Sequence, residues 1–502
     1  MGLASFAVAA GFLLVPIANA GGVVQWDIQK KNHARAKVGK RATSTFTEVI
    51  DYIDDIGGYF ATCTIGTPGQ EVTLQLDTGS SDVWVPSSSA QVCEEDDCSL
   101  GTFESSNSTT FEVVKEDEFD ISYVDETYAK GDYFTDTFVI GGANVSNLTM
   151  GLGINTTIPY GLVGVGFTTG EAIVGTEFSY AAKYANLPAA MSDQGLIATN
   201  AYSLWLNDLD ANTGSVLFGG IDTKKYTGNL TRININPNSL GVYDRFSVNL
   251  TSLHATSSSG TDELTSTQFP IKGILDSGTT VTYVPTDLAE EVWKEAGAVY
   301  NPDLELPLIP CSMVDSDGYF SFGFAGPNGP KINVAMDELI FDLNNDVGLS
   351  QTFSSGDYEG QEACEFGIQN DTGSDYYFGD TFLRSAYVVY DLQNYQIAMA
   401  PTNFNATDSN IVAFASKGAL IPSATLASNQ SQATATSTFT QPAYAAKDGF
   451  TQGLKDLKDS KSLKESKDSG STTVSPSGLG HLAVVGVTML VSLFGGGLFL
   501  VG

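Results

Sequence analysis

The chain has 502 residues, of which 58 are acidic and 24 are basic, and its formal net charge is −34. This excess of negative charge excludes nucleic acid as a natural partner, because the phosphate backbone is itself an anion. A chain of this length exceeds one ordinary hydrophobic core, so we expect two packed lobes with appended segments.

The N-terminus predicts two removable segments. Residues 1–20 contain the apolar run FAVAAGFLLVPIA and end in Ala-Asn-Ala, the small-x-small pattern of a signal-peptidase site; a buried N-terminal helix is the alternative. Residues 21–41 are basic and end in Lys40-Arg41, a dibasic pair of the kind that processing proteases cut. This second stretch therefore indicates a short pro-segment.

The body of the chain, residues 42–402, predicts an all-β protein. Runs rich in Val, Ile, Thr, Tyr and Phe, separated by Gly, Asn and Asp, are typical of strands. We expect strands at 59–66, 71–77, 132–140, 215–221, 386–392 and 395–400. Only FSYAAKYA at 178–185 and DLAEEVWKEAG at 287–297 predict helices.

One pattern occurs twice in this body. An apolar strand runs into Asp-Thr/Ser-Gly and a hydroxyl residue at 77–80 and again at 276–279. Each copy is followed far downstream by two large residues and a glycine, at Gly164 and at Gly379. We interpret the repeat as an internal duplication, with one copy in an N-terminal lobe (42–238) and one in a C-terminal lobe (239–402).

Two acids on equivalent loops suggest a specific chemistry. If the lobes pack about a pseudo-twofold axis, Asp77 and Asp276 meet, and like charges so close share one proton. A water between them can then attack a peptide carbonyl, with one acid as base and the other polarising the carbonyl. A glycosidase with two carboxylates is the alternative. The glycines after each acid would let the backbone approach closely, and the neighbouring hydroxyl groups would hold each carboxylate by hydrogen bonds. These supporting residues are Thr78, Gly79, Ser80, Ser277, Gly278 and Thr279.

A third acid, Asp371, stands in the same tetrapeptide, DTGS, as Asp77. It follows Gln369-Asn370 rather than an apolar strand, and it lies within the sequon at Asn370. We therefore expect a solvent-facing turn here, not a catalytic acid.

Cysteines and sequons agree with passage through an oxidising, glycosylating compartment. Cys93 and Cys98 could close a small loop and Cys311 and Cys364 a longer one, which leaves Cys63 as a buried free thiol. We expect no metal site, since there is no CxxC pair and only three His are present. The nine sequons lie at Asn107, Asn144, Asn147, Asn155, Asn229, Asn249, Asn370, Asn405 and Asn429.

The C-terminus predicts a stalk and an anchor. Residues 403–469 are rich in Ser, Thr, Ala and Lys without a periodic apolar face, which indicates a disordered, glycosylated stalk. Residues 482–502 are apolar, and no Lys or Arg follows them. With the polar spacer upstream, residues 470–502 have the layout of a glycosylphosphatidylinositol attachment signal, with Ser469 and Gly470 as candidate attachment residues. A retained transmembrane helix is the alternative.

The two Asp motifs resemble those of the pepsin-like aspartic proteases, over about 51–402. The resemblance implies a bilobal all-β fold, an active site between the lobes, peptide or protein substrates, a monomer and no cofactor. It makes Asp77 and Asp276 the catalytic dyad and Tyr123 the residue of a flap that closes over substrate, hydrogen-bonded by Trp84. Val124 and Glu126 stand where family flaps usually carry Gly. A catalytically inactive surface binding or wall-structure protein of this fold is the alternative.

The signal peptide, dibasic site, stalk and anchor signal together resemble the yapsin group of fungal cell-surface aspartic proteases. That resemblance implies a preference for basic residues, with Asp125 on the flap accepting Lys just before the cleaved bond. The acidic stretch at 94–97 would add to this attraction. Lys40-Arg41 would be a self-processing site, and the basic pro-segment would lie across the acidic cleft. The mature protein would face outward from the plasma membrane or cell wall, held by a lipid anchor.

Overall fold

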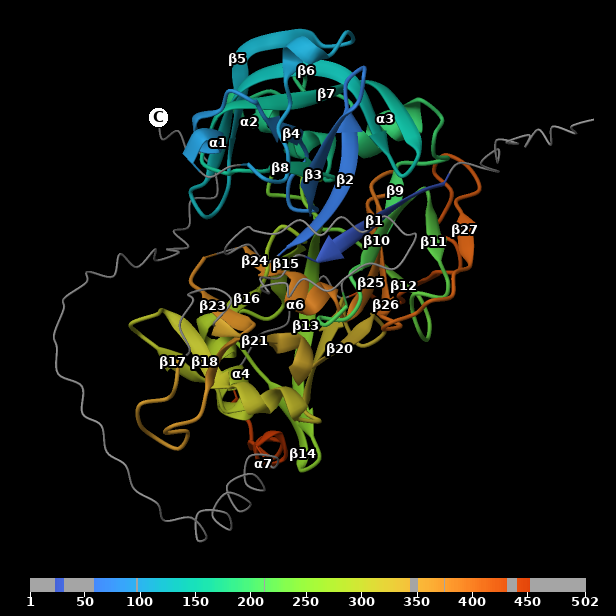
Figure 1. Ribbon diagram of the computed structural model, residues 1–502. Helices are drawn as coiled ribbons and strands as arrows, with labels where there is room; N and C mark the ends of the chain where they lie inside the picture. Colours follow the sequence, from blue (N-terminus) through green and yellow to red (C-terminus); the bar gives the residue numbers. More distant parts are fainter. Residues whose placement is uncertain are drawn as a thin grey trace, which may run out of the picture.

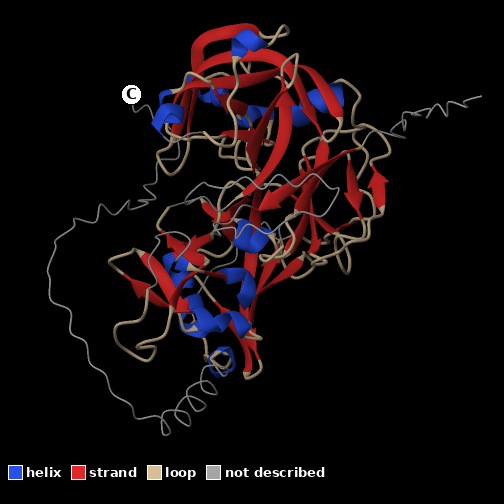
Figure 2. Ribbon diagram, viewed as in Figure 1, coloured by secondary structure: helices blue, strands red, loops and turns tan. Residues whose placement is uncertain are grey.

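The computed structural model describes residues 23–30, 58–95, 98–211, 213–343, 351–373, 375–430 and 440–451. An N-terminal lobe (β2 to β8) and a C-terminal lobe (β13 to β24) are joined by further strands that lie between them (Figure 1). Figure 2 shows that strands dominate both lobes and that the helices are short. The predicted all-β, bilobal class is confirmed. The expected signal peptide, Lys40-Arg41 and the apolar C-terminal stretch lie outside the described residues.

The largest sheet has 14 strands and extends from the N-terminal lobe into the junction between the lobes. Strands β25 and β26, which end the predicted body, pair with β9 and β12 from its first half. This sheet therefore contains strands from both sides of the predicted boundary at 238/239. In sheet order its strands are β28 (Thr425–Leu426), β12 (Thr231–Asn234), β26 (Gln396–Pro401), β25 (Ala386–Asp391), β9 (Ala201–Trp205), β10 (Gly214–Phe218), β1 (Val24–Lys30), β2 (Tyr59–Ile65), β3 (Gln70–Asp77), β8 (Gly161–Gly164), β4 (Val83–Pro86), β7 (Ala143–Thr156), β6 (Tyr128–Ile140) and β5 (Glu112–Ser122).

The C-terminal lobe contains an eight-stranded and a four-stranded sheet. The first consists of β20 (Lys331–Ala335), β19 (Tyr319–Phe324), β13 (Ser247–Ser257), β15 (Ile271–Leu275), β24 (Tyr376–Phe378), β16 (Thr282–Pro285) and β23 (Ile368–Asp371), with β14 (Gly260–Leu264) paired to β13. The second consists of β17 (Val299–Asn301), β18 (Leu306–Pro310), β22 (Ala363–Phe366) and β21 (Ile340–Phe341), and a separate pair is formed by β11 (Gly220–Asp222) and β27 (Ile411–Ala413).

Both lobes use the same strand arrangement around their Asp motif. In the N-terminal lobe β3 is parallel to β8, and β8 is antiparallel to β4. In the C-terminal lobe β15 is parallel to β24, and β24 is antiparallel to β16. The apolar residues of these strands are buried, including Leu76, Leu275 and Phe378. The duplicated sequence pattern is thus a duplicated structure, and it brings each Asp to the end of a buried strand.

One predicted helix is present and the other is wrong. Helix α4 (Thr286–Ala296) ends at Gly297, whose φ of 82° gives the left-handed C-terminal cap that favours glycine. The segment 178–185 is not helical. Helix α2 (Ala172–Thr176) ends before it, and Phe178 adopts a left-handed backbone conformation with a φ of 51°. The remaining α-helices of the described residues are α1 (Gln91–Glu95), α3 (Leu187–Asp193), α6 (Asp380–Leu383) and α7 (Lys447–Phe450). None of the helices in the described ranges is long and apolar enough to cross a membrane.

The described part of the expected pro-segment is a strand of the largest sheet. Strand β1 pairs with β10 over residues 24–28 and with β2 at its end. It buries Val24, Trp26 and Ile28, and the Trp26 indole N–H donates to the carbonyl of Thr62 at 2.9 Å. The expectation that this segment lies across an acidic cleft is wrong for residues 24–30. Apolar side chains at alternate positions place it in the sheet instead.

The expected disordered stalk is wrong for residues 403–430 and 440–451. Strand β27 pairs with β11, β28 pairs with β12, and the side chains of Phe414, Ile421 and Ala427 are buried. Farther on, α7 packs against the C-terminal lobe through Phe450, which is 1% exposed. A few apolar residues in a polar composition are enough to dock this stretch, although they form no periodic face.

Candidate active site

Asp77 and Asp276 lie at the ends of β3 and β15, where the two lobes meet. Both side chains are buried, and their carboxyl groups are close enough to share a hydrogen bond. The backbone approaches closely from the opposite lobe: a Cβ added to Gly79 would lie 2.5 Å from the carboxyl carbon of Asp276, and one added to Gly278 would lie 2.6 Å from Oδ1 of Asp77. Only glycine leaves room for the carboxyl groups to meet.

Each carboxylate is held by the loop that carries it. Oδ1 of Asp77 accepts from the N–H of Gly79 at 2.7 Å, and its Oδ2 accepts from the hydroxyl of Ser80. Oδ1 of Asp276 accepts from the N–H of Gly278 at 2.8 Å, and its Oδ2 accepts from the hydroxyl of Thr279 at 2.8 Å. The two sets of bonds are equivalent, as the duplication requires.

Thr78 and Ser277 have a different role from the expected one, because they do not hold the carboxylates. The Thr78 hydroxyl donates to the Leu275 carbonyl at 3.0 Å and accepts from the N–H of Ser277 at 2.9 Å. The Ser277 hydroxyl donates to the Leu76 carbonyl at 3.0 Å and accepts from the N–H of Thr78 at 3.2 Å. These four buried bonds join the two loops across the lobes and fix the spacing of the acids.

The environment of the pair favours a bound proton. Burial is the main cause that raises the pKa of Asp77, to about 7, and the negative charge of Asp276 adds to it. The hydrogen bonds from Ser80 and Gly79 act in the opposite direction and are weaker. The pair therefore retains a proton at acidic pH and loses it as the pH rises through about 7.

The two downstream glycines have the structural role expected of them. A Cβ added to Gly164 would lie 2.6 Å from the backbone nitrogens of Ser81 and Asp82, and one added to Gly379 would lie 2.3 Å from the carbonyl of Thr279. Each active-site loop is crossed by a strand of its own lobe at a distance that no side chain allows.

The expected flap is the hairpin between β5 and β6. The indole N–H of Trp84, a fully buried residue, donates to the Tyr123 hydroxyl at 2.8 Å. The turn closes through the N–H of Tyr123 and the carbonyl of Thr127 at 2.9 Å. Glu126 adopts a φ of 67°, so the tip uses the left-handed conformation that glycine usually supplies.

Asp125 lies exposed on this turn. Its Oδ1 accepts from the N–H and the hydroxyl of Thr127, at 3.0 and 2.6 Å. These local bonds orient the carboxylate on the flap. Of the acidic stretch at 94–97, Glu94 and Glu95 lie at the end of α1 and the other two residues lie outside the described ranges.

Both expected disulfides are present. Cys93 pairs with Cys98 and Cys311 with Cys364, with Cα separations of 4.8 and 4.9 Å. Cys63 is free and buried. Within the described residues, no group of three or more His, Cys, Asp or Glu side chains is arranged to hold a metal ion.

Asp371 does not lie in the solvent-facing turn that the sequence predicts. It ends β23, which pairs in parallel with β16, and the side chain is buried, with Oδ1 accepting from the N–H of Gly373 at 2.9 Å. The prediction of a solvent-facing turn at Asp371 is therefore wrong, because the paired strand β23 extends to Asp371, inside the sequon. Asp371 is nevertheless not part of the Asp77–Asp276 pair.

The sequons differ in exposure. Asn249 and Asn370 are half-buried in paired strands, and the Asn249 amide is hydrogen-bonded to Asn236 at 2.9 Å. The others are exposed, at Asn107, Asn144, Asn147, Asn155, Asn229, Asn405 and Asn429.

Sequence reasoning missed a second buried acid pair, beneath the flap. Asp82 is fully buried and accepts from Tyr184 Oη at 2.7 Å, Tyr133 Oη at 3.2 Å and the N–H of Ala172 at 2.8 Å. Glu171, 2% exposed, accepts from the N–H of Tyr184 at 2.8 Å. The only sequence signal was Asp82 in DTGSSDVWV, which stands directly before the apolar residues Val-Trp-Val.

Two pseudo-symmetric β-lobes, joined across paired Asp-Thr/Ser-Gly loops and covered by a Tyr-bearing hairpin, define a pepsin-like aspartic protease. The chain belongs to the eukaryotic aspartyl protease family, whose model matches residues 58–402. It is an aspartic-type endopeptidase.

Three fungal relatives illustrate the membership. The chain is 40% identical to the probable aspartic-type endopeptidase opsB of Aspergillus fumigatus over 398 residues, which cover 79% of this chain and 78% of the relative. It is 32% identical to secreted aspartic protease 8 of Candida albicans, over 71% of this chain and 79% of the relative. It is 31% identical to barrierpepsin of Saccharomyces cerevisiae, over 70% of this chain and 61% of the relative.

Proposed function

We propose that Asp77 and Asp276 are the catalytic dyad of this endopeptidase. The charged carboxyl takes a proton from a water held between the two acids, while the protonated carboxyl donates to the carbonyl oxygen of the scissile peptide. Water oxygen then bonds to the carbonyl carbon and gives a gem-diol, without a covalent enzyme intermediate. Proton transfer to the amide nitrogen lets the C–N bond break. Tyr123 and Trp84 close the flap over the substrate.

The observation that carries the assignment is the contact of the two carboxyl groups. A retaining glycosidase separates its two carboxyl groups by about 5 Å so that a sugar fits between them. Here the carboxyl groups of Asp77 and Asp276 are close enough to share a hydrogen bond. Their supports, Ser80 and Thr279, are both in place, which also disfavours an inactive binding module. Loss of peptide cleavage on replacement of either acid is the direct test.

We further propose a preference for a basic residue just before the cleaved bond, through Asp125. In Asp125→Asn the amide oxygen keeps the bonds to Thr127 while the charge is removed, so the preference for Lys over an uncharged isostere should fall by about fivefold. Competitive cleavage of a peptide library at pH 4 and pH 6 measures it. Glu126→Gln, which removes a neighbouring flap charge, is the matched control and should keep the preference. An unchanged ratio in Asp125→Asn would remove Asp125 from specificity.

The proposed life cycle begins with secretion and removal of residues 1–20, followed by cleavage after Arg41. The name of the Candida relative, secreted aspartic protease 8, supports secretion. Cleavage after Arg41 separates β1 from the rest of the chain, although β1 pairs with both β10 and β2. Self-processing at a dibasic site agrees with the proposed basic preference. We expect the protein to act as a monomer.

We propose a lipid anchor at Ser469 or Gly470, which would hold the protein at the outer face of the plasma membrane or in the cell wall. The layout of residues 470–502 supports this anchor. Treatment of membranes with a phosphatidylinositol-specific phospholipase should release the protein. Release by high salt alone, or retention after the treatment, would contradict the anchor. The seven exposed sequons are the expected glycan sites, while Asn249 and Asn370 should be used less.

A further inference from the structure

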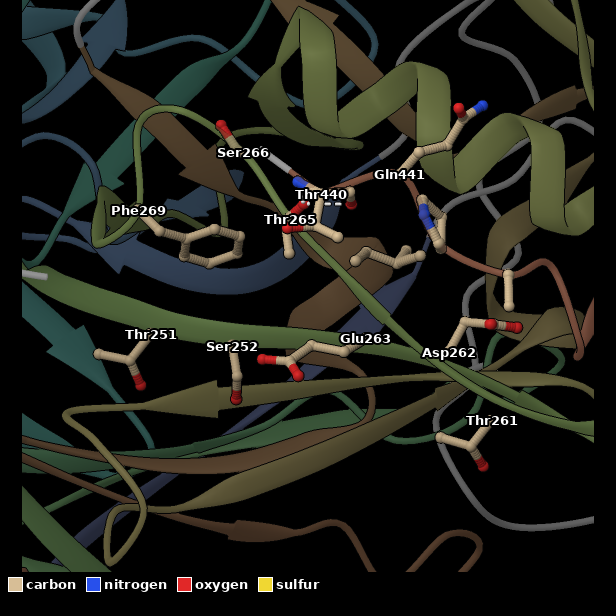
Figure 3. Close-up of a pocket in the computed structure, with 13 residues that line it drawn as sticks. Thr251, Ser252, Thr261, Asp262, Glu263, Thr265, Ser266, Phe269, Thr440 and Gln441 are labelled. Carbon is tan, nitrogen blue, oxygen red and sulfur yellow. Dashed lines mark hydrogen bonds between the residues drawn. The ribbon is translucent and has the colours of Figure 1, made fainter. Parts of the chain in front are cut away.

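Residues 440–451 are held on the base of the C-terminal lobe by a row of hydrogen bonds. Thr440 and Thr265 bond each other twice, at 2.8 and 2.9 Å, as Figure 3 shows from the side of the adjoining pocket. The N–H of Ala446 donates to Oδ2 of Asp262 at 2.8 Å, and the Ser259 hydroxyl donates to the Ala445 carbonyl at 2.6 Å. This segment, named the latch below, follows a gap in the described chain at 431–439.

The latch ends in a side chain for which the lobe provides a fitted site. Phe450 is 1% exposed and stacks on Phe320 with ring centroids 5.3 Å apart. A Cβ on Gly318 would lie 2.1 Å from the Phe450 ring, so the absence of a side chain at Gly318 creates the space that Phe450 fills. The Ser316 hydroxyl donates to the Phe450 carbonyl at 3.0 Å. The docking is therefore specific, not an incidental contact of a polar tail.

Three buried carboxylates lie under the latch. Asp262 comes from β14, and Glu291 and Glu295 lie one helical turn apart on α4. Glu291 is balanced by Lys294 at 2.9 Å and by the Tyr444 hydroxyl of the latch. Glu295 is fully buried, and among the described residues no N–H or hydroxyl group donates to its carboxylate oxygens; the Asp262 carboxyl is the neighbour close enough to share a hydrogen bond with it. A charged Glu295 in this position would be strongly disfavoured.

Solvent can reach the edge of this cluster. A pocket of about 500 Å³ lies between the β13–β14 hairpin and residues 440–443 (Figure 3). Asp262, Thr265 and Thr440 all line it. Residues 440–443 of the latch line the same pocket, so the pocket brings solvent to the contact between the latch and Asp262.

We propose that residues 440–451 are a proton-controlled latch, closed while the buried Glu295 beside Asp262 is protonated and released once Glu295 is charged. Because the segment lies between the protease body and the proposed anchor, its release lengthens the free tether. The latch itself depends on neither the anchor nor the dyad. An experiment that contradicts the latch therefore leaves the proposed function untouched, and the reverse is also true.

The electrostatics give the direction of the switch. Burial is the main cause that raises the pKa of Glu295 from 4.5 to about 8, and the Asp262 carboxyl adds to it; Lys447 of α7 lowers the pKa slightly and Glu291 of α4 raises it slightly. From β13 the group in contact with the latch is the neutral hydroxyl of Ser257. Undocking hydrates Glu295 and returns its pKa toward 4.5. The closed latch thus binds more protons, and its docking constant falls by up to about tenfold per pH unit between 4.5 and 8.

Hydrogen–deuterium exchange of residues 440–451, corrected for the chemical exchange rate, tests the latch. The full chain is used with Asp276→Asn to prevent self-cleavage. Amide protection at Ala446 and Gly449 should fall by about 100-fold or more between pH 5 and pH 8. Glu295→Gln carries no charge, so its protection should be independent of pH. Glu290→Gln, which alters an exposed acid on the same helix, is the matched control and should behave as the parent.

Two further variants keep the outcome decisive if Glu295→Gln does not fold. Gly318→Ala should displace Phe450 and open the latch at both pH values, which gives the fully exchanged reference. Asp262→Asn keeps an acceptor for Ala446 and removes the neighbouring charge, so the loss of protection with pH should become smaller. The proposal is overturned if protection in the parent does not change between pH 5 and pH 8. It is equally overturned if Glu295→Gln or Asp262→Asn loses protection as steeply as the parent.

Discussion

Replacing Asp77 with Asn, or Asp276 with Asn, is expected to lower kcat/KM for peptide cleavage by at least about 10³-fold. An amide neither accepts the proton of the attacking water nor shares a proton with the other acid, so general acid–base catalysis is lost. The fold should remain, because an Asn oxygen can still accept from Gly79 or Gly278. Initial rates on a reporter peptide, with circular dichroism as the check on folding, measure the effect.

The matched control is Asp371→Asn, which alters the acid of the other DTGS sequence. Its amide can still accept from Gly373, and its activity should equal that of the wild type. Cleavage after Arg41 should stop in the dyad variants and continue in Asp371→Asn. Wild-type activity should fall as the pH rises above about 7, since the pKa of Asp77 is raised to about 7 and the pair then loses its proton. Residual proteolysis in Asp77→Asn would contradict the dyad.

Glu171→Gln is expected to stabilise the protein at neutral pH. Burial is the main cause that raises the pKa of Glu171 from 4.5 to about 9, and the charge of Asp82 adds to it. The folded state therefore binds more protons than the unfolded state between pH 4.5 and 9, and stability falls as the pH rises through that window. Glutamine at position 171 cannot ionise, so this fall in stability with pH is absent in the variant. At pH 8 the variant should exceed the wild type by about 2–4 kcal/mol in unfolding free energy.

Urea unfolding at pH 5 and pH 8 measures this difference. At pH 5 Glu171 is protonated in the folded state, so the variant and the wild type should agree within about 1 kcal/mol. Glu116→Gln, which changes an exposed acid of β5, controls for the loss of one negative charge and should shift stability little at either pH. Equal pH dependence of Glu171→Gln and wild type would show that Glu171 is not the source of the neutral-pH loss.

The meeting of the two motif acids could be predicted from sequence because its signal is local and repeated. Asp77 and Asp276 each follow an apolar strand, and the strand fixes where the carboxyl points. The two disulfides and α4 were also readable from spacing and periodicity. The same local reasoning failed at Asp371, where a turn-like composition lies in a paired strand. It failed because the partner strand β16 lies far away in sequence.

The remaining misses share that cause. Thr78 and Ser277 bond across lobes nearly 200 residues apart, so nothing beside them in sequence indicates their partners. Glu171 and Glu295 look like ordinary acids of a strongly acidic chain, and only tertiary packing makes them buried. The tail docks through a few residues such as Phe414 and Phe450, too few to produce a periodic pattern.

The 14-stranded sheet, which joins strands from distant parts of the chain, affects how the protein folds during synthesis. Strands β9 and β12 leave the ribosome well before their neighbours β25 and β26, which are made at the end of the protease body. Nascent chains fold from the N-terminus as each unit becomes complete. Here the first half waits with unpaired strand edges until about residue 401 has been translated. The growing polypeptide therefore exposes strand edges, which favour aggregation, while the residues between β12 and β25 are being synthesised.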